Sequence, residues 1–173
     1  MKNYKQIVQI KNHMGFSKVT RNKVYGCRQS QFHPVNKEKY NGTLPIITRS
    51  SWEHSFCMFC DKTPNIIKWA SESIVIPYFD KSSNKERRYF IDFSFTVKTK
   101  NNEYKTYWVE IKPHKQTLKP EEKSFRKKEK FIDACNVYIR NVCKWKAATE
   151  AANKRGYEFK VITEKELHPQ NYK

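Results

Sequence analysis

The chain has 173 residues, of which 35 are Lys or Arg and 17 are Asp or Glu, giving a formal net charge of +18 at pH 7. This excess is larger than solubility requires and predicts a polyanionic partner. The length suits one compact domain with an extension. The chain lacks an apolar run of about eighteen residues and any Walker-type or G-x-G-x-x-G motif, which argues against a membrane span and a nucleotide-phosphate site. An odd number of cysteines, five, favours reduced thiols in a cytoplasm.

Residues 1–49 are rich in lysine and arginine, and Glu38 is their only acidic residue. Aromatic residues are interleaved with these cations, a composition typical of a segment that lies along phosphate groups. We therefore predict a basic N-terminal arm or small subregion over residues 1–49 and a core over residues 50–173. A solvated basic tail is the simpler alternative for the first segment.

The first predicted helix covers residues 50–61, and the turn sequence at residues 63–65 ends it. Its apolar residues recur at i, i+4, i+7 and i+8 as Trp52, Phe56, Phe59 and Cys60. The sequence at residues 50–53, Ser-Ser-Trp-Glu, matches an S-x-x-E capping box. Cys57 and Cys60 have the spacing of zinc ligands, but no second C-x-x-C completes a set of four, so we predict two buried core cysteines.

Three strand patterns follow, at residues 73–79, 89–97 and 106–112. Each run is rich in β-branched and aromatic residues and is bounded by polar residues. The connections are short, and residues 101–102 form the tip of the second one. Short connections join neighbouring strands as hairpins, so we expect the three strands to pair antiparallel.

A helical region is predicted to open at residues 120–122 and to end at Gly156, which is suited to a helix cap. Its apolar stripe comprises Phe125, Ile132, Cys135, Ile139, Val142, Trp145, Ala148 and Ala152. Residues 157–163 form the last predicted strand. The order α-β-β-β-α-β indicates an α/β sandwich built on a mixed sheet.

Two carboxylates occur within these apolar strand patterns. In the second strand, residues alternate so that Asp92 lies on the less apolar face, opposite the face of Ile91 and Phe93. Glu110 and Lys112 share one face of the third strand, roughly 7 Å apart. If the second and third strands pair as a hairpin, Asp92 lies beside Glu110, and three charges converge on one sheet surface.

Two adjacent carboxylates repel one another, and a divalent cation removes that penalty. Magnesium prefers such oxygen ligands and keeps several waters. Lys112 is placed to orient or deprotonate an attacking water and to stabilise negative charge on a phosphate. These are the requirements of phosphodiester hydrolysis. Taken singly, an ordinary Glu110–Lys112 pair and a hydrogen-bonded Asp92 explain the same residues.

The pattern of Asp92, then Glu110-x-Lys112, after a helix bearing a glutamate resembles the PD-(D/E)xK nuclease superfamily. Longer stretches, including "RSSWEHSFCMFCDKTPNIIKWASESIVIPY", "VEIKPHKQT" and "CKWKAATEAANKRGYEFKVITEKEL", are similar to the head completion nucleases of large contractile-tailed phages. TnsA-type transposon endonucleases are more distantly similar. Ile91 precedes Asp92, where the superfamily's name has proline.

The resemblance implies a restriction-endonuclease-like fold and a Mg2+-dependent DNA endonuclease, with Mn2+ as a substitute, that trims packaged DNA ends in head completion. It implies catalytic roles for Glu53, Asp92, Glu110 and Lys112, with the metal held by Asp92, Glu110 and the backbone carbonyl of Ile111. Substrate contacts are expected from Lys115, Gln116, Arg126 and Lys127.

The expected partners are DNA and the capsid portal or neck proteins, with no membrane, and the oligomeric state is open. The expected location is the host cytoplasm during phage assembly, with retention in the virion. A protein that holds DNA or completes the capsid without cutting is the alternative, as is a transposon-type endonuclease. Glu72 is expected to pair with a lysine, and Trp145 to lie in the core beside a surface Lys144.

Overall fold

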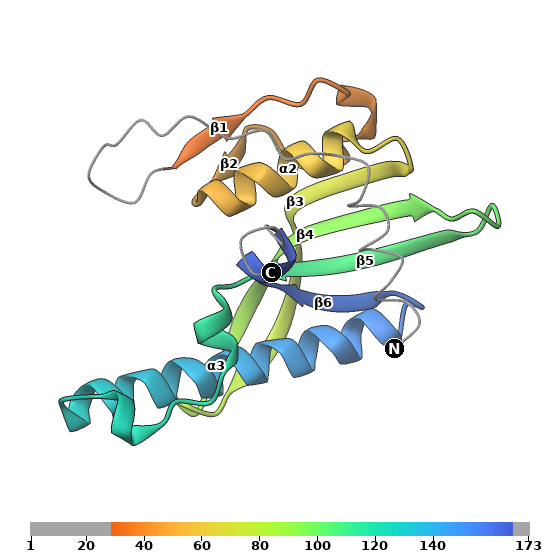
Figure 1. Ribbon diagram of the computed structural model, residues 1–173. Helices are drawn as coiled ribbons and strands as arrows, with labels where there is room; N and C mark the ends of the chain where they lie inside the picture. Colours follow the sequence, from red (N-terminus) through yellow and green to blue (C-terminus); the bar gives the residue numbers. More distant parts are fainter. Residues whose placement is uncertain (1–28, 168–173) are drawn as a thin grey trace.

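The computed structural model describes residues 29–167 (Figure 1). The elements are β1 (Ser30–Phe32), η1 (Lys37–Lys39), β2 (Ile46–Thr48), α2 (Ser51–Lys62), β3 (Ile66–Asp80), β4 (Lys85–Lys98), β5 (Tyr104–Ile111), η2 (His114–Thr117), η3 (Glu122–Ser124), α3 (Lys128–Asn153), β6 (Glu158–Ile162) and α4 (Glu164–Leu167). The order from α2 to β6 confirms the predicted α-β-β-β-α-β arrangement.

The main sheet has the strand order β3-β4-β5-β6. β4 is antiparallel to β3 and to β5, whereas β6 is parallel to β5, so the sheet is mixed as predicted. The parallel connection from β5 to β6 passes through α3, which is the usual way for a chain to return to the same sheet in the same direction. Gly156 adopts a positive φ of 71° between α3 and β6, as its predicted capping role requires.

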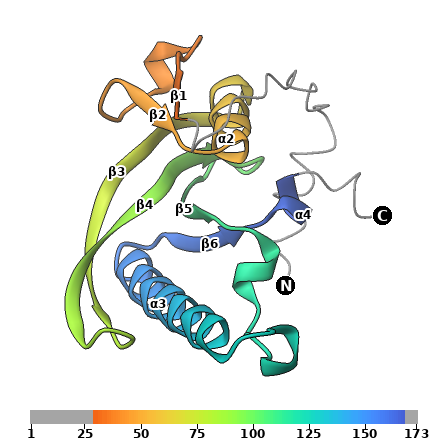
Figure 2. The ribbon, with the colours of Figure 1, turned by 90° about the vertical axis from the view of Figure 1, so that its left-hand side faces the viewer.

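The two long helices pack against different clusters of apolar side chains. Successive residues of β5 alternate between these clusters: Val109 packs with Phe56 of α2, and Trp108 packs with Ala148 of α3. Figure 2 shows that the β3–β4 hairpin extends beyond the rest of the sheet and curves around α3. The sheet thus has α2 near one end and α3 inside the curved hairpin.

A β-bulge interrupts the pairing of β3 with β4. Between the pairs Ser71↔Phe93 and Ile74↔Ile91, β3 has two residues and β4 has one, Asp92. One of the two, Glu72, has a positive φ of 48°. A bulge increases local twist and re-aims side chains, and Ile91 accordingly packs in the α3 cluster, although the alternation predicted that it shares the face of Phe93.

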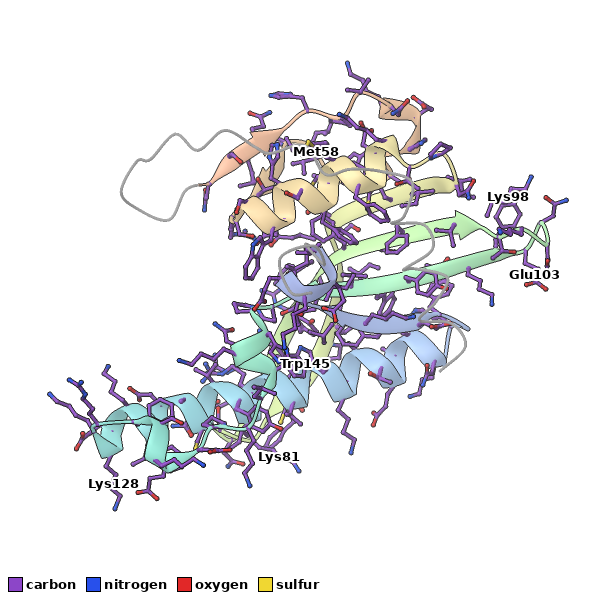
Figure 3. All side chains as sticks on the ribbon, in the orientation of Figure 1. Met58, Lys81, Lys98, Glu103, Lys128 and Trp145 are labelled. Atoms are coloured by element: carbon purple, nitrogen blue, oxygen red, sulfur yellow. The ribbon has the colours of Figure 1, made fainter. Side chains whose placement is uncertain are left out.

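The predicted boundaries differ from the structure in the elements that flank the sheet. β3 begins at Ile66, before the predicted residue 73, and α3 begins at Lys128. The first half of the predicted apolar stripe is not core, because Ile132 and Ile139 are 48% and 38% exposed. This part of α3 extends past the sheet toward Lys128, at the far end of the molecule (Figure 3).

The described part of the predicted N-terminal arm is folded. β1 and β2 pair antiparallel and pack near α2, and Phe32 and Ile46 lie in the core cluster of that helix. The carboxylate of Asp61 accepts hydrogen bonds from the backbone N–H groups of Val35 and Asn36, at 3.0 Å each. Residues 1–28 of the arm lie outside the described residues, and the division at residue 49 stays a prediction.

Candidate active site

Glu110 is a buried carboxylate near the end of β5. It is 2% exposed, and both of its oxygens have partners. Its Oε2 accepts a hydrogen bond of 2.7 Å from the hydroxyl of Tyr89, and its Oε1 lies 3.0 Å from the ammonium of Lys112. A buried charge requires such compensation. One partner comes from β4 and the other directly follows β5, so together they fix the carboxylate in place.

Asp92 lies where β4 leaves β5. The pairing of these strands begins at Phe93↔Val109, so Asp92 and Glu110 occupy the next opposed positions. The Oδ2 atom of Asp92 accepts a hydrogen bond of 2.8 Å from the backbone N–H of Ile111. The Asp92 side chain therefore bonds a backbone group of β5 just beyond the last paired residues. The predicted neighbourhood of Asp92 and Glu110 is present in the structure.

The two carboxylates affect one another electrostatically. Burial raises the pKa of Asp92 well above its ordinary value, and repulsion from Glu110 raises it further. The Ile111 N–H and the Lys112 ammonium oppose this rise without cancelling it. The site thus holds more negative charge than the described side chains compensate, which is the condition in which a bound cation stabilises a carboxylate pair.

Lys112 supplies the positive charge closest to this pair. Burial alone would lower the pKa of its ammonium, but attraction to Glu110 and the hydrogen bond with Glu110 outweigh burial and raise the pKa. Lys112 is therefore protonated at neutral pH. This state suits the predicted role of stabilising negative charge.

Glu53 is a helix-capping residue in the structure. The Ser50 hydroxyl accepts from the Glu53 backbone N–H at 3.1 Å, as the predicted capping box requires. The carboxylate reaches back to two donors, the Ser50 hydroxyl at 2.9 Å and the Arg49 backbone N–H at 2.7 Å. Its charge is also close enough to raise the pKa values of Asp92 and Lys112. Capping and membership of the acidic site are therefore compatible.

Arg49 and Glu72 form an ion pair beside this group. Glu72 was predicted to pair with a lysine, and its partner is an arginine instead. The reason is the bulge, which places Glu72 near the chain that leads into α2. Interactions with Glu53 and Asp92 contribute to the raised pKa of Arg49, so its guanidinium belongs to the same electrostatic neighbourhood.

The donor set fits a hard divalent cation that keeps part of its water shell. No group of three or more His, Cys, Asp or Glu side chains within residues 29–167 is arranged as a metal site. Asp92 and Glu110 provide two carboxylates, and the backbone of Ile111 lies next to Asp92, to which its N–H donates. Magnesium is commonly bound by one or two carboxylates, with waters and substrate phosphates completing its coordination.

The other predicted site residues are exposed and make no described contact with the carboxylates. Lys115 and Gln116 lie in η2, and Arg126 and Lys127 lie just before α3. They belong to the long connection between β5 and α3, which begins directly after Lys112 in the sequence. Their substrate contacts stay predictions, as do the catalytic roles of the acidic residues.

Tyr89 and Lys144 lie near the carboxylates although neither was predicted as a site residue. Tyr89 looked like an ordinary apolar strand residue, and simple alternation places it on the face opposite Asp92. The bulge removes that alternation, and Tyr89 bonds Glu110. Lys144 was predicted to be a surface residue beside Trp145, but it is partly buried, and its ammonium lies 5.1 Å from the centre of the Tyr89 ring. No signal in a single sequence distinguishes either residue.

The core predictions near the site are mostly confirmed. Cys57 and Cys60 are fully buried free thiols, and burial raises both pKa values, which fits inert core cysteines. Trp145, predicted to be core, is only partly buried. Within residues 29–167, no helix is both long and apolar enough to cross a membrane.

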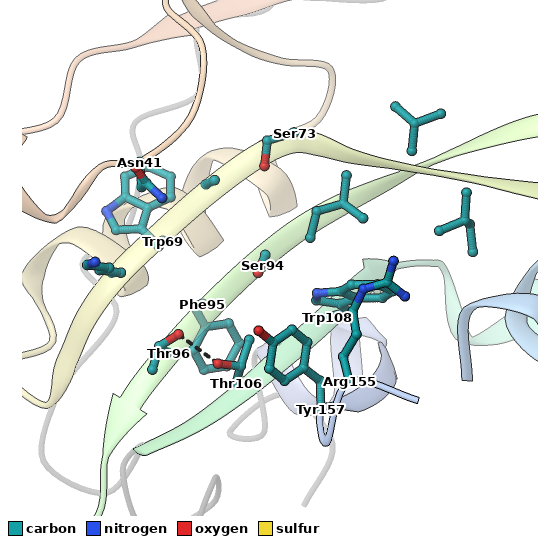
Figure 4. Close-up of a pocket in the computed structure, with 15 residues that line it drawn as sticks. Asn41, Trp69, Ser73, Ser94, Phe95, Thr96, Thr106, Trp108, Arg155 and Tyr157 are labelled. Carbon is teal, nitrogen blue, oxygen red and sulfur yellow. Dashed lines mark hydrogen bonds between the residues drawn. The ribbon is translucent and has the colours of Figure 1, made fainter. Parts of the chain in front are cut away.

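A cavity of about 590 Å³ lies on the sheet, and Figure 4 shows the residues that line it. Ser94 and Trp108 line it, and the Arg155 guanidinium lies 5.4 Å from the centre of the Trp108 ring. Ser94 is two positions along β4 from Asp92, and Trp108 is two positions along β5 from Glu110, which is roughly 7 Å in each case. None of the predicted site residues lines the cavity, so it is separate from the candidate active site.

Two comparisons with known proteins agree with this geometry, while no solved structure matches the chain. Residues 63–164 match the family model described as "TnsA-like endonuclease N terminal", a range that includes Asp92, Glu110 and Lys112 but not Glu53. The chain is also similar to the head completion nuclease of Enterobacteria phage T4, with 40% identity over 144 residues that cover 81% of this chain and 93% of that protein. The chain therefore belongs to the TnsA-like endonuclease family.

Proposed function

We propose that the chain is a metal-dependent DNA endonuclease that hydrolyses phosphodiester bonds during completion of a phage head. The observation that carries the chemistry is the Asp92–Glu110 pair, in which one carboxylate has a strongly raised pKa and the other is held by Tyr89 and Lys112. The similarity to a head completion nuclease supports the biological setting. The net charge of +18 supports a DNA substrate.

Asp92, Glu110 and the Ile111 carbonyl would hold Mg2+, with Mn2+ as a substitute. When bound, this ion supplies Lewis acidity toward a phosphate oxygen and lowers the pKa of a water. Tyr89 keeps the Glu110 carboxylate in one orientation through its hydrogen bond of 2.7 Å. The Ile111 N–H does the same for Asp92. The protein thus contributes a preorganised pair of ligands.

Lys112 contributes the positive charge of its ammonium. Its raised pKa keeps it protonated, and its position beside Glu110 places that charge at the edge of the carboxylate pair. A fixed cation stabilises negative charge that develops on a phosphate during hydrolysis. The charge of Glu53 further favours the protonated lysine.

The relative's name supports a role in completing the phage head. A head completion nuclease that cuts DNA would trim DNA ends that protrude after packaging, in the host cytoplasm, before the neck joins the portal. The DNA substrate and the capsid portal or neck proteins are then the partners, with retention in the virion as a consequence of binding there. The exposed cations Lys115, Arg126 and Lys127, with Gln116, would contact the DNA backbone next to the site.

The competing function is a protein that binds DNA on the same fold without cutting it. Cleavage by the parent in magnesium, its loss in chelator, and its loss in Asp92→Ala with DNA binding retained would support the nuclease. If the parent and Asp92→Ala bind DNA equally and neither cleaves a strand in magnesium or manganese, the competing function, DNA binding without cleavage, is supported. Binding is measured in calcium, which has a looser coordination shell and is expected to support little cleavage.

A further inference from the structure

Among the described residues, one face of α3 carries two buried hydrogen-bond donors without acceptors and a lysine without an ion pair. Asn141, Lys144 and Trp145 are spaced i, i+3 and i+4, which places them on one side of the helix. The Nδ2 of Asn141 and the Nε1 of Trp145 are buried and have no hydrogen-bond partner among the described residues. Asn141 is only 5% exposed. Buried donors without acceptors are costly, so a cluster of them indicates a place for an acceptor.

Lys144 adds a positive charge to these donors. Among residues 29–167, its ammonium forms no ion pair, in contrast to Lys112, which is held by Glu110. The ammonium lies over the Tyr89 ring at 5.1 Å, and the Tyr89 hydroxyl bonds Glu110. Lys144 is therefore one side chain away from the carboxylate pair, on the helix side of the site.

The charges around Lys144 explain why it is not simply a surface lysine. Burial lowers the pKa of Lys144, and Glu110 and Asp92 partly restore it. Lys112 and Arg140 are the like charges near it. Arg140 is already bound to Asp80 at 2.9 Å, so Lys144 is the cation of this group that is left available to an anion.

We propose that Asn141, Lys144 and Trp145 form a phosphate-binding subsite that holds a phosphodiester of the DNA strand next to the one that is cleaved. The inference rests on the proposed function. One cationic and two neutral donors on a helix face match the acceptor oxygens of a phosphate. The subsite positions the strand, whereas Asp92, Glu110 and Lys112 act on the reacting phosphate.

The test uses Lys144→Met, which keeps the aliphatic stem and removes the charge, with Lys146→Met as the matched control. Lys146 is on the same helix but is exposed and faces Glu150 at 4.0 Å. Binding of a labelled DNA duplex with a protruding end is measured in calcium at several salt concentrations. We expect Lys144→Met to bind about 3- to 10-fold more weakly, with a salt slope smaller by about one. Lys146→Met should change affinity less than about twofold.

Two further variants separate charge from folding. Trp145→Phe keeps one aromatic ring but removes the indole N–H together with part of the ring volume, and it should weaken binding by about 2- to 5-fold with an unchanged salt slope. Lys144→Arg keeps the charge and should recover most of the affinity. Thermal unfolding of each variant checks that the fold is retained.

Several outcomes would overturn the subsite. Lys144→Met and Lys146→Met could weaken binding equally, which would mean that only net charge matters. Lys144→Met could lose cleavage with parental affinity and slope, which would make Lys144 a positioning residue that acts through Tyr89. A third result separates the subsite from the proposed function. If Lys144→Met binds DNA more weakly and Lys146→Met does not, but the parent never cuts DNA, the proposed function is contradicted and the subsite stays supported.

Discussion

Two aspartates of the β3–β4 hairpin, Asp80 and Asp92, lie in buried surroundings and have opposite electrostatic outcomes. Asp80 ends β3 at the curved tip of the hairpin and is fully buried. Burial alone would raise its pKa, but hydrogen bonds from Ser82, Arg140 and Ser83 outweigh burial and lower it. Asp92 has one backbone hydrogen bond and a second carboxylate beside it, and its pKa is raised.

The difference teaches how to separate a structural carboxylate from a functional one in this fold. The protein provides Asp80 with its full set of donors, including Arg87 at 3.0 Å and Arg140 at 2.9 Å. It leaves Asp92 with a charge that the Lys112 ammonium and the Ile111 N–H offset only in part. A carboxylate that costs stability in the folded protein is a candidate for a bound cation and for catalysis.

The largest expected effect is the loss of cleavage in Asp92→Asn. The amide keeps the size of the side chain and an oxygen for the Ile111 N–H but has no charge for a cation. We expect cleavage in magnesium to fall at least about 1,000-fold, equivalent to about 4 kcal/mol of transition-state stabilisation. The rate is measured with labelled DNA under single-turnover conditions. Parental cleavage by this variant would remove Asp92 from the site.

Asp80→Asn is the matched change at the other aspartate, and it should reduce stability rather than chemistry. We expect the free energy of unfolding in urea at pH 7 to fall by about 1–3 kcal/mol, because the charged contacts with Arg87 and Arg140 are weakened. Solvent screens the exposed parts of both arginines, which limits the size of the loss. Cleavage per folded molecule should stay near the parental rate. A stable Asp80→Asn protein that cannot cut DNA would break the comparison.

The difference in unfolding free energy between the parent and each of these two variants should change with pH in opposite directions. The lowered pKa of Asp80 stabilises the parent above the ordinary carboxyl pKa of about 3.9, and this advantage disappears as the pH falls toward the lowered value. The raised pKa of Asp92 destabilises the parent as the pH rises from about 3.9 through the raised value. Urea unfolding between pH 2 and pH 7 spans both windows, with the Asp80 effect below about pH 4 and the Asp92 effect above it. Parallel pH profiles for the two variants would contradict the assigned shifts.

A smaller effect is expected from Glu53→Gln, which sharpens the comparison because Glu53 both caps a helix and adds charge to the Asp92 site. Glutamine has one acceptor oxygen where Glu53 accepts from Ser50 and Arg49, so unfolding should become easier by about 1 kcal/mol or less. Cleavage should fall about tenfold, or about 1.4 kcal/mol. Parental cleavage together with reduced stability would make Glu53 a cap alone.

Much of the architecture could be predicted from sequence because it depends on local patterns. The α2 cap depends on Ser50 and Glu53, and the C-cap of α3 depends on Gly156. The antiparallel pairing that brings Asp92 to Glu110 follows from a short connection between strands. In each case the determining residues are neighbours in the chain, so one sequence is sufficient.

The remaining features depend on contacts between distant residues. The bulge opposite Asp92 has no local signature, because Glu72 is not a residue type that marks positive φ. The bulge in turn decides that Tyr89 reaches Glu110. Likewise the apolar residue Ile132 predicted a buried stripe, but the sheet does not extend far enough to cover it.

The central claim, that Asp92 and Glu110 form a cation site, is tested most directly by the effect of magnesium on unfolding stability, which needs no DNA and no cleavage. A ligand at ten times its dissociation constant stabilises the folded state by about 1.4 kcal/mol. We predict that magnesium stabilises the parent by an amount of this order at saturating concentration. In chelator, Asp92→Asn should be as stable as the parent or more stable, because the repulsion is removed, and magnesium should not stabilise it further. Equal stabilisation of both proteins by magnesium, or of neither, would contradict the claim.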